Sequence, residues 1–167
     1  MGARSKLGIG LAVAGLMALV PAAASAEERT CTGTIGAATL DNVRVPQNAK
    51  CVLKRTKVQG TIKVERNAIL RAKRVRVIGN VQGENAQRVN VVKRSRIGGS
   101  VQVVQGHAAK VTRSRIKADV QAFENSGRIR IAHNVIDGNL QCKENSQAPI
   151  GGNNIVHGNR EDQCAGL

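Results

Sequence analysis

The sequence predicts an all-β protein, a single-domain parallel β-helix (β-solenoid) wound in coils of 19–20 residues. A short phrase recurs at that interval, aliphatic residues form columns at fixed distances from it, and the composition is unusual. The 167 residues include 18 glycines but one aromatic residue, Phe123. An ordinary mixed globule needs large side chains to fill its centre, whereas a thin, regular aliphatic core does not.

The recurring phrase is glycine, a polar residue, an aliphatic residue and then, in most copies, glutamine. Successive copies begin 19 or 20 residues apart, at Gly60, Gly79, Gly99, Ala118, Gly138 and Gly158. A fixed period of this length is the signature of a solenoid, in which each repeat forms one coil.

Three columns of residues are expected to face the core. Two residues before the phrase stand Val58, Val77, Ile97, Ile116, Ile136 and Val156, and two residues after its start stand Ile62, Val81, Val101, Val120, Leu140 and Arg160. Seven residues before the phrase stand Leu53, Ala72, Val92, Val111, Ile131 and Gly151. Polar residues separate the columns, so the local period is two and the segments are short β-strands. Stacked coils would pair these strands in parallel around a continuous core.

The coil length favours a right-handed solenoid, because left-handed β-helices built on hexapeptide repeats have turns of about 18 residues. In architecture, residues 33–162 resemble the pectate-lyase-like β-helix superfamily and, more loosely, the small bactofilin-type solenoids that polymerise. The resemblance rests on the period and the columns, so it implies a fold and carries over no active site.

The first 26 residues have the pattern of a secretory signal peptide. Arg4 and Lys6 precede an apolar run from Leu7 to Val20, and a small-residue stretch ends at Ala26. The run is shorter than the roughly 20 residues of a transmembrane helix. We expect cleavage after Ala26, a solenoid domain over residues 27–167 with no membrane span, and a secreted or cell-envelope location.

Four cysteines lie about one coil apart in two pairs. Cys31 and Cys51 are 20 residues apart, and Cys142 and Cys164 are 22 apart. Exported proteins pair their cysteines, so we expect one disulfide at each end of the solenoid, where coils would otherwise fray. A zinc site is the alternative, but the Cys-x-x-Cys spacing is missing.

The chain is strongly basic. It has 26 Lys and Arg residues against 11 Asp and Glu, and two of the basic residues lie in the leader, which leaves a net charge of about +13. Two columns of mostly basic residues stand five and three residues before the phrase and are expected to share one outer face. They are Arg55, Arg74, Arg94, Arg113, His133 and Asn153, and Lys57, Arg76, Arg96, Arg115, Val135 and Ile155. The residues between them are small or polar enough to face inward: Thr56, Val75, Ser95, Ser114, Asn134 and Asn154.

A third basic column, six residues before the phrase, completes the predicted binding face. Its eleven cations are Lys54, Arg55, Lys57, Lys73, Arg74, Arg76, Lys93, Arg94, Arg96, Arg113 and Arg115. Like charges on rungs about 4.8 Å apart repel one another, so their repetition over four coils favours binding of an extended polyanion. Cell-wall polymer, acidic polysaccharide, lipid head groups and nucleic acid all have suitable charge. The alternative is a solvated face kept charged for solubility, which both signs of charge would serve equally well.

Beside the phrase, one outward column holds Gln82, Gln102, Gln121 and Gln141, and the next holds Asn80, Ser100, Asp119, Asn139 and Asn159. These columns form either a flat binding surface or amide ladders bonded from coil to coil, and the ladder is the simpler interpretation.

We expect no enzyme activity, no catalytic residue, no small-molecule substrate, no cofactor and no metal. Asp137 and His157 should stack on neighbouring rungs, as an ion pair rather than a catalytic pair. Every cysteine is assigned to a bridge, and no serine completes a triad. The three histidines, His107, His133 and His157, lack metal-ligand spacing. The lack of aromatic platforms also disfavours stacking of single-stranded nucleic acid.

Two classes of function remain, besides a secreted effector that would leave no recognisable pattern. One is a binding module for anionic polymers, and the other is a structural protein that assembles end to end. Pro46 near the start, the two staples, and the charged segment 160–162 where an aliphatic column would continue all favour closed ends. We therefore expect a monomeric binding module.

Overall fold

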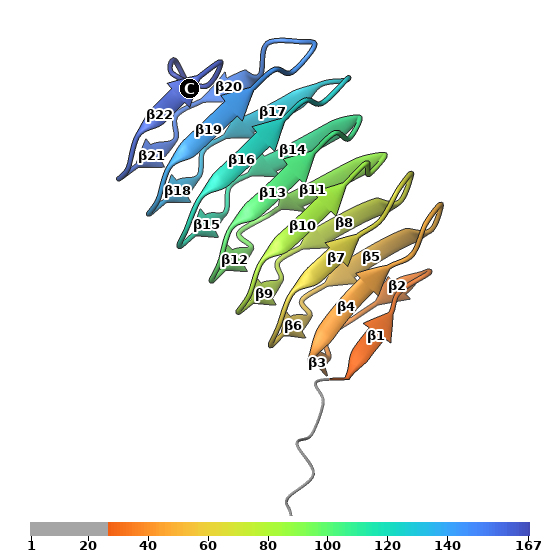
Figure 1. The fold of residues 1–167 in the computed structure, drawn as a ribbon. Coiled ribbons are helices and arrows are strands. Elements are labelled where there is room, and N and C mark those ends of the chain that lie inside the picture. Colours follow the sequence, from red (N-terminus) through yellow and green to blue (C-terminus); the bar gives the residue numbers. More distant parts are fainter. Residues whose placement is uncertain (1–26) are drawn as a thin grey trace, which may run out of the picture.

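Short parallel strands wind around a single axis in the computed structural model, which describes residues 27–167 (Figure 1). The described residues contain 22 strands and no helix, and they make about seven coils. The predicted β-solenoid is therefore confirmed. The predicted signal peptide, residues 1–26, lies outside the described residues.

Each coil contributes one strand to each of three parallel sheets, here named A, B and C. Sheet A contains β1 (Glu28–Thr30), β4 (Asn42–Val45), β7 (Ile62–Val64), β10 (Val81–Glu84), β13 (Val101–Val104), β16 (Val120–Phe123), β19 (Leu140–Lys143) and β22 (Arg160–Asp162). Sheet B contains β2 (Thr34–Ile35), β5 (Lys50–Lys54), β8 (Ile69–Lys73), β11 (Arg88–Val92), β14 (Ala108–Thr112), β17 (Ile129–Ala132) and β20 (Ile150–Gly152). Sheet C contains β3 (Thr39–Leu40), β6 (Lys57–Val58), β9 (Arg76–Val77), β12 (Arg96–Ile97), β15 (Arg115–Ile116), β18 (Val135–Ile136) and β21 (Ile155–Val156).

Two of the predicted inward columns line the core as expected. Val58, Ile97 and Ile116 of sheet C are at most 1 % exposed, as are Ile62 and Leu140 of sheet A. The sheet A column ends at Arg160, which pairs in register with Leu140 but is exposed. The alternation of buried and exposed residues thus follows the period of two.

The prediction for the sheet B column was wrong at one rung. Val91, not Val92, pairs with Ala72 and Val111, and Val91 is completely buried while Val92 is half-buried. This coil has its extra residue between Val92 and Arg96, at the corner that joins sheet B to sheet C. Counting back from the phrase across that corner shifts the assignment by one residue.

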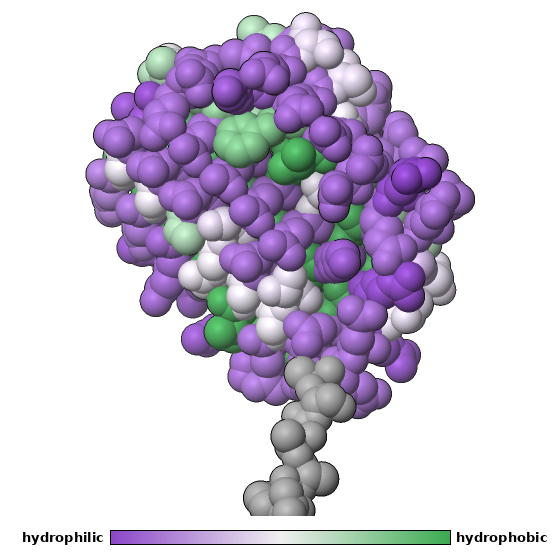
Figure 2. Space-filling view, viewed as in Figure 1, coloured by the Kyte–Doolittle hydropathy of each residue, from purple (hydrophilic) through white to green (hydrophobic). Residues whose placement is uncertain are grey.

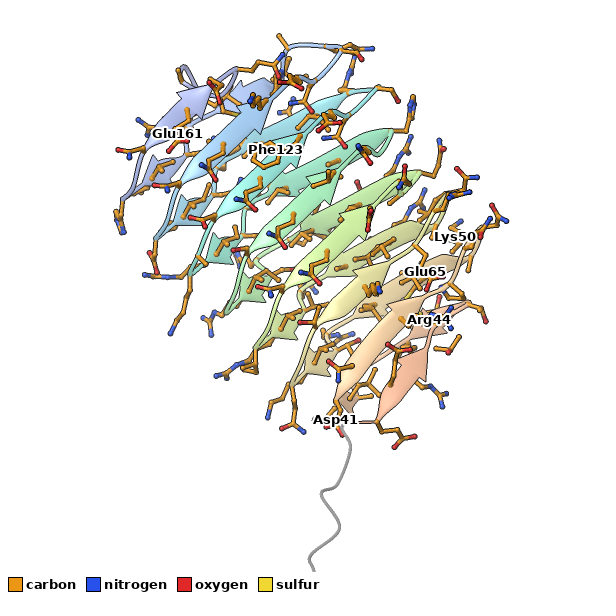
Figure 3. The ribbon with its side chains drawn as sticks, viewed as in Figure 1. Asp41, Arg44, Lys50, Glu65, Phe123 and Glu161 are labelled. Atoms are coloured by element: carbon orange, nitrogen blue, oxygen red, sulfur yellow. A yellow bond between two sulfur atoms is a disulfide. The ribbon has the colours of Figure 1, made fainter. Side chains whose placement is uncertain are left out.

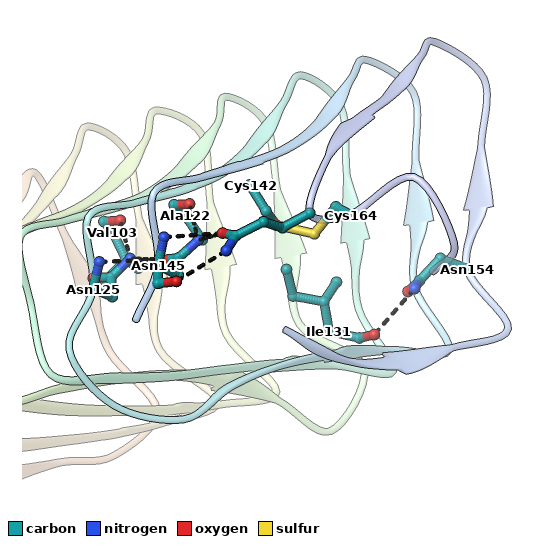
Figure 4. The surroundings of a disulfide bond; sticks show 9 residues. Val103, Ala122, Asn125, Ile131, Cys142, Asn145, Asn154 and Cys164 are labelled. Atoms are coloured by element: carbon teal, nitrogen blue, oxygen red, sulfur yellow. Dashed lines mark hydrogen bonds between the residues drawn. A yellow bond between two sulfur atoms is a disulfide. The ribbon is translucent and has the colours of Figure 1, made fainter. Parts of the chain in front are cut away.

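Buried asparagines stack at two of the corners. At the corner between sheets A and B, Asn125 Nδ2 donates to Asn145 Oδ1 (2.8 Å) and to the carbonyl of Val103 (3.0 Å), and Asn145 bonds onward to Gln163 (Figure 4). At the corner between sheets B and C, Asn134 Nδ2 donates to Asn154 Oδ1 (3.0 Å). These side chains satisfy backbone groups that the turning chain leaves without strand partners.

The glutamine column forms the expected amide ladder. Each Nε2 donates to the Oε1 of the next coil, at 3.0 Å from Gln82 to Gln102 and at 2.7 and 2.8 Å at the next two steps. The last amide, Gln141, donates to the carboxylate of Glu161 (2.7 Å). Because the amides bond to one another, this column belongs to the scaffold. The face of sheet A seen in Figure 2 is mostly hydrophilic, with apolar side chains scattered between polar ones.

Both predicted disulfides are present, Cys31–Cys51 and Cys142–Cys164. Each joins neighbouring coils at one end of the solenoid, and all four cysteines are buried against the core. Disulfides are typical of proteins in oxidising compartments. None of the described residues forms a helix that is long and apolar enough to cross a membrane.

Candidate anion-binding face

The sheet C column of the predicted binding face is continuous. Lys57, Arg76, Arg96 and Arg115 pair in register through β6, β9, β12 and β15, and all four side chains are exposed. Nitrogen-tipped side chains project along this side of the solenoid in Figure 3. Neighbouring strands lie about 4.8 Å apart, so the column presents one cation per rung.

The corner column runs beside it at the turn between sheets B and C. Its cations are Arg55, Arg74, Arg94 and Arg113, all exposed. The residues between the two columns, such as Thr56 and Ser95, are buried, as expected. The two columns therefore flank one edge of the solenoid.

The four corner arginines have left-handed backbone conformations, with φ of 57°, 55°, 63° and 51° in coil order. Arginine is an unfavourable residue there, because its Cβ crowds the following carbonyl, whereas Gly and Asn adopt this region more readily. At the corner between sheets A and B, the same conformation is held by Asn48, Asn67 and Asn85 in the early coils. The long cationic side chain thus occupies a position that backbone geometry would give to Asn or Gly.

Replacing both Arg74 and Arg94 with Asn is expected to raise the free energy of unfolding by about 1 kcal/mol, since the left-handed conformation costs a non-glycine residue about 1–2 kcal/mol. The control is Asn at Arg76 and Arg96, which removes the same charge from strand positions where Asn is disfavoured. Urea denaturation of both variants measures the difference. Equal stability of the two variants would contradict the assignment of strain to the corner.

The third column is shorter than predicted. Lys54 and Lys73 pair in register in sheet B, but the next rung of that column is Val92. Lys93 instead lies at the corner beside Arg94, with a φ of 62°, because it is part of the turn that holds the extra residue of its coil. The structure therefore places Lys93 with the corner column.

The structure adds further cations that the spacing from the phrase had not singled out. One outward column along sheet B holds Arg71, Lys110 and Arg130, with the uncharged Asn90 on the rung between the first two. Lys50, Arg88 and Arg128 lie exposed at or just before the starts of its strands. Residues alternate between inward and outward positions along each strand, so the inward column of sheet B predicts that Arg71, Lys110 and Arg130 face outward.

Negative charges are confined to one part of the solenoid. The strands of sheets B and C and the corner between them contain no Asp or Glu within residues 27–167. The acidic residues all lie on or beside sheet A or in the corners next to it. They are Glu27, Glu28, Asp41, Glu65, Glu84, Asp119, Glu124, Asp137, Glu144, Glu161 and Asp162.

Few of the cations on the predicted face are neutralised. Of the eleven, Arg115 alone has a carboxylate oxygen within 4 Å among the described residues, at 3.4 Å from Asp137. Asp137 also contacts His157 Nδ1 at 3.2 Å, so the expected stacked pair is present. Among residues 27–167, no group of three or more His, Cys, Asp or Glu side chains is arranged to hold a metal ion.

A cation of sheet A, Arg44 in β4, is neutralised, in contrast to the cations of the predicted face. Arg44 Nε donates to Glu65 Oε1 at 2.6 Å. The hydrogen bond from Arg44, together with the Gln47 backbone N–H, holds the pKa of Glu65 below its ordinary value, although partial burial opposes the shift. The stabilisation from this pair is therefore present at neutral pH and is lost as the pH falls through the lowered pKa.

Comparison with models of known protein families, with characterised proteins and with solved structures gives no match to this chain.

Proposed function

We propose that this protein is a non-catalytic binding module that holds an anionic polymer or an anionic envelope surface against its cationic face. We define the cationic face as the eleven predicted cations, from Lys54 to Arg115. The observation that carries the proposal is the stacking of these cations on successive coils, on two sheets and a corner without acidic residues.

The cost of this arrangement supports a role in binding. Two unit charges about 4 Å apart in water repel by about 1 kcal/mol, and salt screens part of this. Repulsion recurs at each of the four rungs, and the corner arginines add backbone strain. A solvated face that served only solubility could carry mixed charges, as the surface around sheet A does, and would then have less electrostatic repulsion. A polyanion would relieve the repulsion and release its own counterions on binding.

The ligand that fits best is long and repetitive, because the cations repeat with the rungs. Cell-wall polymer, acidic polysaccharide, lipid head groups and nucleic acid are the candidate classes. Export directed by a signal peptide at residues 1–26 would bring the module to cell-wall polymers, acidic polysaccharides and lipid head groups. No cofactor or chemical step is part of this function.

The test is binding of the oxidised protein to an immobilised polyanion across a salt series, beside a variant with Arg74, Arg76, Arg94 and Arg96 changed to Gln. The logarithm of the affinity should fall linearly with the logarithm of the salt concentration. The variant should reduce that slope by about 3, since each phosphate contact contributes about 0.7–0.9. Equal slopes for the two proteins would refute the proposal.

The second candidate function is structural assembly. The outer edges of β20, β21 and β22 have no strand partner among the described residues, and such edges can pair with another chain. Under this proposal the solenoid would be right-handed, as in the pectate-lyase-like architecture, and would stack end to end, as bactofilin-like solenoids do. Sedimentation velocity over a hundredfold range of protein concentration distinguishes the two proposed functions. The binding module should keep the sedimentation coefficient of a monomer, whereas a solenoid that stacks end to end should form larger species as its concentration rises.

A further inference from the structure

A shallow hollow lies on sheet C beside the central rungs of the cationic face. Its volume is about 320 Å³. Residues from three successive coils line it: Arg76, Val77, Ile78, Arg96, Ile97, Gly98, Arg115 and Lys117.

Gly98 is one of the residues that line the hollow. It stands directly after β12, in the outward column between Ile78 and Lys117, where the backbone of the neighbouring coil comes close to it. A Cβ there would collide with the backbone carbonyl oxygen of Ile78, so the neighbouring coil excludes any larger residue. Glycine at this position therefore lets the two coils pack closely at one side of the hollow.

The lining combines positive charge with an exposed apolar side chain. Arg76, Arg96 and Arg115 come from three consecutive paired strands, and Lys117 stands two positions after Arg115. Arg115 is paired with Asp137 at 3.4 Å, whereas Arg76, Arg96 and Lys117 have no carboxylate oxygen within 4 Å among the described residues. Ile78 is 48 % exposed and offers an apolar side chain beside the cations. A ligand that satisfies both kinds of group has an anion next to an uncharged aliphatic part.

We propose that this hollow seats a phosphate group carried on a short polyol chain, such as one repeat of a glycerol phosphate polymer. This inference rests on the proposed function and names the ligand class. The two charged oxygens of a phosphodiester diverge from a tetrahedral phosphorus and can accept hydrogen bonds from guanidinium groups on neighbouring rungs, whereas the two oxygens of a carboxylate lie in one plane and are matched by one guanidinium fork. Ile78 covers the aliphatic part of the repeat. A nucleobase would require an aromatic platform, which the hollow lacks.

The test uses the oxidised protein and two small probes, glycerol 1-phosphate and galacturonate, followed through the amide signals in NMR titrations at about pH 5, where each probe carries about one negative charge because the second pKa of the phosphate is about 6. Glycerol 1-phosphate should shift the amides of residues 96–98 and 116–117 in a saturable way, and galacturonate should bind at least several times more weakly. Arg96→Gln should weaken phosphate binding by about tenfold or more, which matches the loss of a charged hydrogen bond.

Arg94→Gln is the matched control, because it removes the same charge two residues away on the same rung but outside the hollow. It should weaken glycerol 1-phosphate binding by less than about threefold, as expected for a screened charge at a distance. Equal losses in the two variants, shifts spread over the whole face, or no saturable shift would each overturn the subsite.

Two further probes identify the source of the phosphate. A soluble oligo(glycerol phosphate) and vesicles of phosphatidylglycerol are compared, and binding of either that depends on Arg96 more than on Arg94 supports the subsite. If both variants lose polymer binding equally while salt dependence persists, the subsite fails and the proposed function stands. If the phosphate probe binds at Gly98 but polymers show no salt-dependent binding, the proposed function fails instead.

Discussion

Replacing Asn134 with alanine is expected to lower the free energy of unfolding by about 2–4 kcal/mol, because a buried polar group left unpaired costs about 1–3 kcal/mol and a lost hydrogen bond about 1 kcal/mol. Asn134 is 1 % exposed. Its Oδ1 accepts the backbone N–H of Ser114 at 3.0 Å, and its Nδ2 donates to the carbonyl of Val111 at 2.8 Å. Alanine would leave the Ser114 N–H without its acceptor inside the corner and would remove the second hydrogen bond to the Val111 carbonyl, which lies in the paired strand β14.

Asn139 gives the matched control on the same coil. Its Oδ1 accepts only the exposed backbone N–H of Asn159 at 2.8 Å, and water can replace that bond. Asn139→Ala should therefore cost less than about 1 kcal/mol. Urea denaturation of the two variants makes the comparison. Similar losses would mean that the buried asparagines do not support the turns in the way the hydrogen bonds indicate.

Replacing both Cys142 and Cys164 with alanine is expected to open the last coil without unfolding the central ones. The loop-entropy model gives about 3 kcal/mol for a bridge that closes 22 residues, which corresponds to about a hundredfold faster amide exchange. In a solenoid each coil contacts only its neighbours, so the loss should remain local. Hydrogen exchange should show the increase in β20, β21 and β22, while β11 and β12 keep their protection.

The opposite result would be a uniform loss of protection along the chain. Such a loss would mean that the coils unfold as one cooperative unit and that the bridge stabilises the whole domain. The Cys31–Cys51 pair offers the same comparison at the other end, where exchange should increase in β1, β2 and β3 only.

Repeat spacing predicted the three-sheeted core well, because each inward position is fixed by a short alternation within one strand. It failed where the count crossed a corner of variable length. Val92 was placed inward and Lys93 in the third basic column, since nothing in the sequence marks which corner of a 20-residue coil holds the extra residue. The strand pairing locates the extra residue, because Val91 pairs with Ala72 and Val111, and Lys73 pairs with Val92.

Other features could not be predicted from the sequence, because residue spacing alone does not show whether a side chain is buried or which backbone conformation it has. Asn125 and Asn145 stand twenty residues apart, but sequence alone does not separate a buried amide ladder from exposed polar residues. The left-handed conformation of Arg74 and its equivalents could not be predicted, because Arg is an uncommon residue there. Gly98 belonged to none of the columns that the sequence singled out, and the hollow beside it depends on how three coils pack.

The most direct test of the central claim compares two variants of equal net charge. One has Arg74, Arg76, Arg94 and Arg96 changed to Gln on the cationic face. The other has Arg29, Lys63, Arg66 and Lys143 changed to Gln, on sheet A or beside it. If the face holds the polymer, the first variant loses binding and salt dependence while the second binds like the unchanged protein. Equal losses in both would show that net charge alone attracts polyanions, and would contradict a binding site on this face.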